Sequence, residues 1–288
     1  MPTENAQQLF EIAKRTAVKA GKVVLEIYDS GDFTSFQKED DSPVTTADYK
    51  ANEVIMDMLR KETPDIPIMS EETEISSLAL RETWTRYWLI DPIDGTQEFI
   101  ARSGDFAVNI ALIENNVPIM GVIYWPTGET LYSALRGHGA FKECPVENKQ
   151  IFVRNLEAPN EDPLIIAISR RQPREKVISS LSQDRVYQTL PAGSCSLKAC
   201  FIAEGKADVF LRFGVTGEWD TGASQCIVVE AGGKILAHDF APLSYNLRTS
   251  VINPDFFIMG DQNVDWQNIV KCEFGNDNQP VSSNISPN

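Results

Sequence analysis

The sequence has little histidine, no cysteine pair motif and no long apolar run, and each absence excludes a class of protein. Two histidines, His138 and His238, leave little material for a histidine-rich metal site or a Ser-His-Asp triad. Five cysteines, an odd number without a Cys-x-x-Cys pair, argue against a disulfide framework or zinc ribbon and predict a reducing, cytoplasmic location. No window holds about 18 consecutive apolar residues and no export signal is visible, so no membrane span is expected. Peripheral association with the inner membrane stays open.

Positive charge is also scarce. The chain has 26 Lys and Arg against 41 Asp and Glu, a formal net charge of −15, which disfavours nucleic acid and anionic membranes as partners. An apolar fraction of 42% and a charged fraction of 23% are typical of a globular protein. The length of 288 residues predicts about two domains or one large layered domain.

The first half reads as two helices and an antiparallel sheet, an α+β arrangement. Apolar residues at helical spacing predict a helix from Leu9 to Ile27 that stops at Gly31, and a second helix that opens at Thr45 or Thr46 and ends before Pro64. Short apolar runs predict strands at 66–69, 87–90, 106–113, 117–124 and 130–134, with 33–36 a possible edge strand and 38–43 a solvated loop.

The second half alternates strands and helices, which favours a mostly parallel α/β layer. Strands are expected at 164–168, 207–213 and 234–237, and helices before 181, at 193–204 and from 220 to 231. The polar, non-periodic stretch 144–150 is the candidate boundary. The predicted division is therefore 1–148 and 149–272, with a disordered polar tail at 273–288.

Acidic residues gather at the ends of the predicted elements. Run 87–90 leads into Asp91-Pro92-Ile93-Asp94-Gly95-Thr96, run 66–69 leads into Glu71-Glu72, and Asp48 and Asp220 stand at helix starts. Each carboxylate taken by itself can be explained as a turn or helix-cap residue. Two predicted strands that both end in acidic residues are harder to explain by turn chemistry. If the carboxylates converge, their repulsion requires cations, and oxygen ligands without His or Cys select Mg²⁺ or Mn²⁺ over zinc.

Such a cluster suits the hydrolysis of a phosphate ester. Mg²⁺ ions bridged by Glu71, Asp91 and Asp94 would grip a phosphate oxygen and lower the pKa of a bound water. The Thr96 hydroxyl would orient that water, and Glu71 would accept its proton. Asp220 would place a metal near the leaving oxygen. The predicted reaction is in-line hydrolysis of a phosphate monoester without a covalent intermediate.

The turn between strand and helix supplies further ligands. The carbonyl of Ile93, redirected by Pro92, is a candidate neutral metal ligand. The amides of Gly95 and Thr96, at a helix start, are candidates to bind the remaining phosphate oxygens.

At these residues the chain resembles the inositol monophosphatase superfamily. The similarity spans residues 6 to about 260 and is carried by Asp91–Thr96, Trp219–Gly233, Glu71-Glu72 and Thr45–Asp48. Within the superfamily the chain is most similar to bacterial 3′(2′),5′-bisphosphate nucleotidases, through residues 42–45, 86–89, 97–100 and 197–200.

The resemblance implies a five-layered αβαβα sandwich and removal of the 3′-phosphate from adenosine 3′,5′-bisphosphate to give AMP, in sulfur metabolism. It also implies two or three Mg²⁺ ions, replaceable by Mn²⁺, and inhibition by Li⁺. The implied metal ligands are Glu71, Asp91, Ile93, Asp94 and Asp220, with Asp48 near a third site, and the implied catalytic residues are Glu71, Thr96 and Asp48. The implied substrate-binding residues are Glu71, Ile93, Asp94, Gly95, Thr96, Ser194, Lys198 and Asp220.

Lys198 and Arg170 are expected to grip the second phosphate, although each is otherwise an ordinary solvated charge. The chain departs from its relatives in the loop Ser169–Gln172, where Ser-Arg-Ser-His is usual, at Cys195, where Ser is usual, and at Gly222, where Ala is usual. No proposed metal ligand changes. The first two departures lie where the base or second phosphate is expected.

Three alternatives remain. An inositol or sugar-phosphate monophosphatase shares the chemistry, and the altered Arg171-Gln172 loop leaves room for one. A non-catalytic regulator that binds a phosphorylated ligand would be expected to lose one of the site residues, which are all intact. An acidic protein-interaction domain leaves the two acidic strand ends unexplained.

Overall fold

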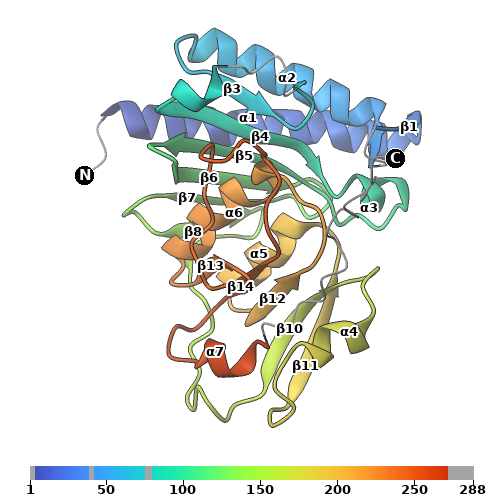
Figure 1. The fold of residues 1–288 in the computed structure, drawn as a ribbon. Coiled ribbons are helices and arrows are strands. Elements are labelled where there is room, and N and C mark those ends of the chain that lie inside the picture. The colour runs from blue at the N-terminus through green and yellow to red at the C-terminus, as the bar shows by residue number, and fades with distance from the viewer. Residues whose placement is uncertain (1–3, 39–41, 75–79, 272–288) are drawn as a thin grey trace, which may run out of the picture.

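Helices and sheets alternate in five layers, in the order α/β/α/β/α, in the computed structural model, which describes residues 4–38, 42–74 and 80–271 (Figure 1). This confirms the αβαβα fold implied by the resemblance. Part of the predicted loop 38–43 and the whole predicted tail 273–288 lie outside the described residues.

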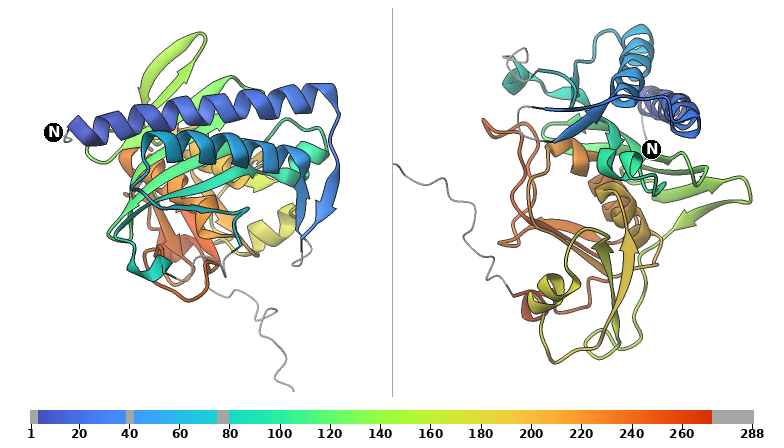
Figure 2. Two further views of the ribbon diagram at one scale, coloured as in Figure 1. Left: turned by 90° about the horizontal axis from the view of Figure 1, so that it is seen from above. Right: turned by 90° about the vertical axis from the view of Figure 1, so that its right-hand side faces the viewer.

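The first layer consists of two long helices, α1 (Glu4–Ser30) and α2 (Thr46–Glu62), which lie side by side over the first sheet (Figure 2). The structure confirms both predicted helices. α1 ends at Ser30, and the next residue, Gly31, has a φ of +69°, which suits glycine. α2 begins with a capping box between Thr45 and Asp48.

Within the described ranges, the first sheet has seven strands in the order β3-β4-β5-β6-β7-β8-β9, antiparallel apart from the β3–β4 pair. Asn115 and Asn116 form the turn between the predicted strands 106–113 and 117–124, and both residues have positive φ, as tight hairpins require. The strands are β3 (Ile68–Ser70), β4 (Arg86–Asp94), β5 (Ala107–Glu114), β6 (Val117–Trp125), β7 (Thr130–Leu135), β8 (Ala140–Cys144) and β9 (Glu147–Ile151). A separate small hairpin pairs β1 (Ser35–Gln37) with β2 (Pro43–Thr45).

The second sheet is mixed, with the order β11-β10-β12-β14-β13 in the described chain. Strand β10 runs parallel to β11 and β12, as the sequence predicted, but β14 runs antiparallel to both of its neighbours. The strands are β10 (Leu164–Ser169), β11 (Tyr187–Ala192), β12 (Val209–Arg212), β13 (Lys234–Ala237) and β14 (Phe256–Met259). The sequence reasoning missed β11 and β14.

Two helices lie between the sheets, α5 (Cys195–Ala203) and α6 (Glu218–Glu230), and two short ones cover the outer face of the second sheet, α4 (Arg174–Ser179) and α7 (Trp266–Ile269) (Figure 1). The apolar cluster between the sheets takes side chains from both halves, among them Tyr132, Phe210 and Ile227. The two halves therefore share one core.

The polar stretch 144–150, predicted to be a boundary, instead belongs to the β8–β9 hairpin that extends the first sheet. Its middle residues are exposed, so no apolar face marks it as a strand. The predicted division at 148/149 falls inside β9, and the division into halves stays a prediction.

Membrane and disulfide features are also limited in the described chain. None of its helices has the length and apolar character to cross a membrane. Its cysteines, Cys144, Cys195, Cys200 and Cys226, are free thiols.

Candidate active site

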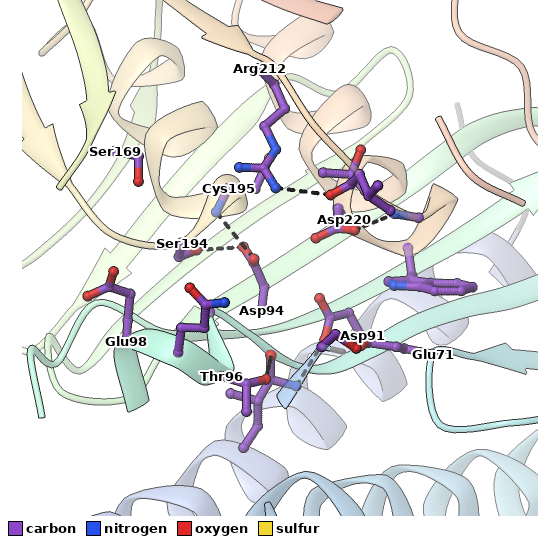
Figure 3. Close-up of a pocket in the computed structure, with 18 of the residues that line it drawn as sticks. Glu71, Asp91, Asp94, Thr96, Glu98, Ser169, Ser194, Cys195, Arg212 and Asp220 are labelled. Atoms are coloured by element: carbon purple, nitrogen blue, oxygen red, sulfur yellow. Dashed lines mark hydrogen bonds between the residues drawn. The ribbon is translucent and has the colours of Figure 1, made fainter. Parts of the chain in front are cut away.

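A pocket of about 260 Å³ opens where β4, α5 and α6 converge (Figure 3). Side chains from both halves line it, because the ends of β4 and β12 and the starts of α5 and α6 meet there. Of the predicted site residues, all but Asp48 and Arg170 line it: Glu71, Asp91, Ile93, Asp94, Gly95, Thr96, Ser194, Lys198 and Asp220. The structure therefore brings together residues that are up to 149 positions apart, from Glu71 to Asp220.

Three carboxylates form the centre of the site. One oxygen each from Asp91, Asp94 and Asp220 lies within 4.8 Å of the others. Burial raises the pKa of both Asp91 and Asp220, and the charges of neighbouring carboxylates raise them further. The ionised carboxylates therefore repel one another, and a bound cation would offset this repulsion.

An irregularity in β4 explains how Asp91 and Asp94 reach the same side of the sheet. Residues three apart on a regular strand point to opposite faces. Here Asp91 pairs with Asn109 and Asp94 pairs with Ala107, so that three steps on β4 match two on β5. Such a bulge re-aims one side chain. Pro92 lies in the bulge, where the regular strand hydrogen bonds are interrupted, so its lack of a backbone N–H is tolerated.

Asp94 is fixed by the start of α5. Its carboxylate accepts hydrogen bonds from the hydroxyls of Ser194 and Ser196, both at 2.5 Å. It also accepts hydrogen bonds from the backbone N–H groups of Ser196 at 2.6 Å and Cys195 at 3.2 Å. Ser194 also caps α5, and it holds a positive φ of +53°, which is strained for a non-glycine residue. Sequence reasoning missed Ser196, since its role depends on α5 approaching β4.

Asp220 reaches the cluster from α6. It was expected to begin that helix, but Gly217 is the N-cap and Asp220 is the third residue. The Asp220 carboxylate accepts the Gly217 N–H at 2.6 Å. The Asp220 side chain thus caps the N-terminus of α6 and also lines the pocket.

Asp48 lies behind the pocket wall and acts on Thr96. The Thr96 hydroxyl lies 2.9 Å from an Asp48 oxygen and 3.2 Å from the Ile93 carbonyl. The other Asp48 oxygen accepts the N–H and hydroxyl of Thr45. Burial raises the Asp48 pKa to about 6 despite these hydrogen bonds. Asp48 therefore orients Thr96 and does not line the pocket itself.

Glu71 lies at the edge of the pocket, where Lys38 holds it. The Lys38 ammonium lies 2.8 Å from Glu71 and 2.7 Å from Glu72. Glu71 is not part of the tight group of three, although its charge raises the pKa of Asp91 and Asp220. Burial, followed by the charge of Glu71, raises the Glu72 pKa to about 7.

The two cations expected to bind a second phosphate are held by other groups. The Lys198 ammonium donates to the backbone carbonyls of Gly193 and Ser194 and lies 4.9 Å from the centre of the Phe210 ring. Arg170 forms an ion pair with Asp105 at 2.9 Å and does not line the pocket. Their substrate roles stay predictions.

The donor set fits a hard divalent cation. It offers buried carboxylate oxygens, a nearby backbone carbonyl and no imidazole, which is the ligand chemistry of Mg²⁺ rather than of zinc. A cation held by Asp91, Asp94 and Asp220 would also offset their mutual repulsion.

The model of the inositol monophosphatase family matches residues 5–263. The chain is 42% identical over 249 residues to the 3′(2′),5′-bisphosphate nucleotidase CysQ of Salmonella typhimurium, covering 86% of this chain and 98% of that protein. It is 43% identical over 241 residues to CysQ of Escherichia coli strain K12, covering 83% and 95%.

Solved structures agree with the sequence comparison. CysQ from Bacteroides thetaiotaomicron is 37% identical with a TM-score of 0.76, over 88% of this chain and 97% of that one. An inositol monophosphatase from Thermotoga maritima is 25% identical with a TM-score of 0.72, over 88% and 92%. This chain therefore belongs to the inositol monophosphatase family of metal-dependent phosphatases.

Proposed function

We propose that this protein is a magnesium-dependent 3′(2′),5′-bisphosphate nucleotidase that converts adenosine 3′,5′-bisphosphate to AMP and phosphate. The observation that carries the chemistry is the convergence of Asp91, Asp94 and Asp220 within 4.8 Å, in a pocket that also contains Thr96 and Glu71. The substrate is proposed from the activity in the names of relatives at 42–43% identity. The proposed location is the cytoplasm.

The carboxylates of Glu71, Asp91, Asp94 and Asp220 and the carbonyl of Ile93 would hold the Mg²⁺ ions. When bound, these ions would polarise the phosphate and lower the pKa of the attacking water. Two or three ions, replacement by Mn²⁺ and inhibition by Li⁺ belong to the same proposal.

The chain's own groups position the reactants. Asp48 accepts a hydrogen bond from Thr96, so the Thr96 hydroxyl oxygen is left to accept a hydrogen bond from the attacking water. Glu71 is proposed to accept the proton of that water. The amides of Gly95 and Thr96 are proposed to bind the phosphate. Gly95 has a φ of +96°, and a Cβ there would lie 3.0 Å from the Asp105 carbonyl oxygen, so a larger residue would be both strained and crowded at this turn.

A second candidate is an inositol or sugar-phosphate monophosphatase. The observation that favours it is the loop after β10, where Arg171 lines the pocket and ion-pairs with Glu98 at 3.0 Å, on the side expected to receive a nucleotide. A regulator without activity is disfavoured, because the proposed catalytic and metal-binding residues are all present.

Phosphate release from a substrate panel with Mg²⁺ tests these candidates. The panel contains adenosine 3′,5′-bisphosphate, inositol 1-phosphate and fructose 1,6-bisphosphate. We expect the highest kcat/KM for the nucleotide, and chelation of Mg²⁺ to abolish turnover. Preference for inositol phosphate would refute the nucleotidase proposal, and no turnover of any ester would favour the regulator.

A further inference from the structure

Asn109, the third residue of β5, has a buried side chain without a hydrogen-bond partner. Its exposed fraction is 1%, and neither its amide nitrogen Nδ2 nor its amide oxygen Oδ1 has a partner in the described chain. Buried polar groups without partners are rare, because each costs the free energy of its lost hydration. A side chain with both polar atoms unpaired therefore calls for a physical explanation.

The strand register places Asn109 beside the metal site. Asn109 pairs with Asp91 between β5 and β4. Side chains of directly opposed residues extend from the same face of a sheet, with Cβ atoms about 4.5–5.5 Å apart. This is the inner face, because Ala107 and Ala111, two residues before and after Asn109, belong to the apolar cluster between the sheets. The Asn109 side chain therefore lies on the face that carries the site.

The bulge in β4 brings a second carboxylate close to Asn109. Asp94 pairs with Ala107, which faces the same side as Asn109, so Asp94 is its diagonal neighbour. On the other side, Asn109 pairs with Ile123 of β6, which is apolar. Across the neighbouring strands, the polar neighbours of Asn109 are thus the two aspartates of the site.

A purely structural role explains this asparagine poorly. A buried amide contributes to stability through its hydrogen bonds, and Asn109 forms none within the described chain. An apolar side chain of similar shape would avoid the cost of the unpaired amide. Outer groups that hydrogen-bond a metal-binding carboxylate are common around metal sites, where they orient the ligand. The amide is therefore expected to gain its partner when the site is occupied.

Of the two aspartates, Asp91 is the one that can accept a further hydrogen bond. A carboxylate offers about four lone-pair sites. The Asp94 carboxylate already accepts four hydrogen bonds from the start of α5, whereas Asp91 accepts the Ile93 N–H at 3.0 Å.

We infer that Asn109 is a positioning residue, whose amide N–H donates to the Asp91 carboxylate, directly or through one water, when a cation is bound. The amide holds the carboxylate in the orientation that binds the cation. This inference rests on the proposed function, because it assigns an orienting group to the metal site of that function.

Asn109→Leu tests the inference, because it removes both polar atoms and keeps a similar shape. Without Mg²⁺ we expect a Tm equal to or above that of the wild type, since an unpaired buried amide is lost. With Mg²⁺ we expect a smaller rise in Tm, and an increase of about tenfold or more in the Mg²⁺ concentration for half-maximal activity. Thermal unfolding with Mg²⁺ and with chelator, and phosphate release from adenosine 3′,5′-bisphosphate over a range of Mg²⁺ concentrations, measure these effects.

Ser133→Ala is the matched control. Ser133 of β7 is also 1% exposed, and its hydroxyl is buried without a partner in the described chain. It faces the opposite side of the sheet, since its neighbours Leu131 and Leu135 belong to the apolar cluster under α1 and α2. The control removes the same kind of unpaired group away from the site, so its Mg²⁺ response should equal that of the wild type.

Wild-type Mg²⁺ dependence in Asn109→Leu would overturn the inference. If that variant does not fold, Asn109→Ala replaces it, and an unchanged Mg²⁺-induced rise in Tm would again overturn the inference. A wild-type protein whose Tm does not respond to Mg²⁺ would refute the proposed metal-dependent function itself, and the inference with it.

Discussion

Asp91 and Asp94 are both proposed metal ligands, but the protein holds them differently. Asp94 accepts hydrogen bonds from Ser194, Cys195 and Ser196, so that Asp94→Asn would disturb α5 as well as the metal site. Asp91 accepts the Ile93 N–H at 3.0 Å and faces other carboxylates. A substitution at Asp91 is therefore the cleaner test of metal binding.

We expect Asp91→Asn to abolish phosphate release and, without Mg²⁺, to raise the free energy of unfolding by about 1 kcal/mol or more. Burial and the charges of Glu71, Asp94 and Asp220 raise the Asp91 pKa, and a buried polar or charged group without a partner typically costs about 1–3 kcal/mol. Mg²⁺ should raise the wild-type Tm but have a smaller effect on the variant. Thermal unfolding with Mg²⁺ and with chelator measures this.

Glu114→Gln is the control for Asp91→Asn, because Glu114 lies on the surface and pairs with Arg86. Its Mg²⁺ response should equal that of the wild type. A variant at Asp91 that keeps the full Mg²⁺-induced rise in Tm would show that the metal lies elsewhere.

The carboxylates of the site were predictable from the sequence because most of them sit in short continuous motifs at element ends. Ser196 and Asn109 were not, since nothing near them in the sequence reveals that α5 reaches Asp94 or that β5 places Asn109 opposite Asp91. The role expected of Lys198 followed from family resemblance, and its contacts with backbone carbonyls could be seen only after folding.

At the scale of elements, the position of Asp220 depends on how closely α6 approaches the first sheet. Gly121 of β6 lies against α6, and a Cβ built there would be 2.2 Å from the Ala223 carbonyl oxygen. The atom in the way belongs to the backbone of α6, which cannot move aside as the end of a flexible side chain can. The glycine therefore allows the close contact that sets the distance between Asp220 and the carboxylates on β4.

We expect Gly121→Ala to lower the free energy of unfolding by about 1–3 kcal/mol, the usual cost of overpacking, and to lower kcat by displacing α6. Denaturant unfolding and steady-state kinetics measure the two effects. Gly222→Ala is the comparison, because its added methyl would meet the tip of the Leu89 side chain at 2.8 Å while alanine favours the helix by about 1 kcal/mol. It should cost less than Gly121→Ala. Equal costs would contradict this account of the β6–α6 contact.

Strands that carry an apolar periodicity were predicted well, whereas β9 was not. Residues 148–150 are exposed, so their sequence resembles a linker, and pairing with β8 supplies the reason for the strand. β14 was also missed, although Phe256–Met259 is an apolar run that is buried throughout; its antiparallel pairing with both neighbours could not be predicted from the sequence. Backbone pairing between distant segments leaves no local signal.

At the scale of the whole molecule, the two halves are joined by more than the pocket. The apolar cluster between the sheets includes Tyr132 from β7 and Phe210 from β12. Ion pairs cross the same boundary, from Arg170 to Asp105 and from Arg171 to Glu98. The active site lies on this boundary, so its geometry depends on both halves being folded together.

We therefore expect the full chain to unfold in one cooperative transition, with a calorimetric enthalpy equal to the van't Hoff enthalpy, and the fragment 1–148 to remain unfolded. That fragment cuts β9 and lacks α6, which covers the inner face of the first sheet. Exposing that face would leave the fragment without the burial that offsets its conformational entropy. Differential scanning calorimetry of the chain and circular dichroism of the fragment measure this. Two separate transitions, or a folded fragment, would mean that the halves are independent domains.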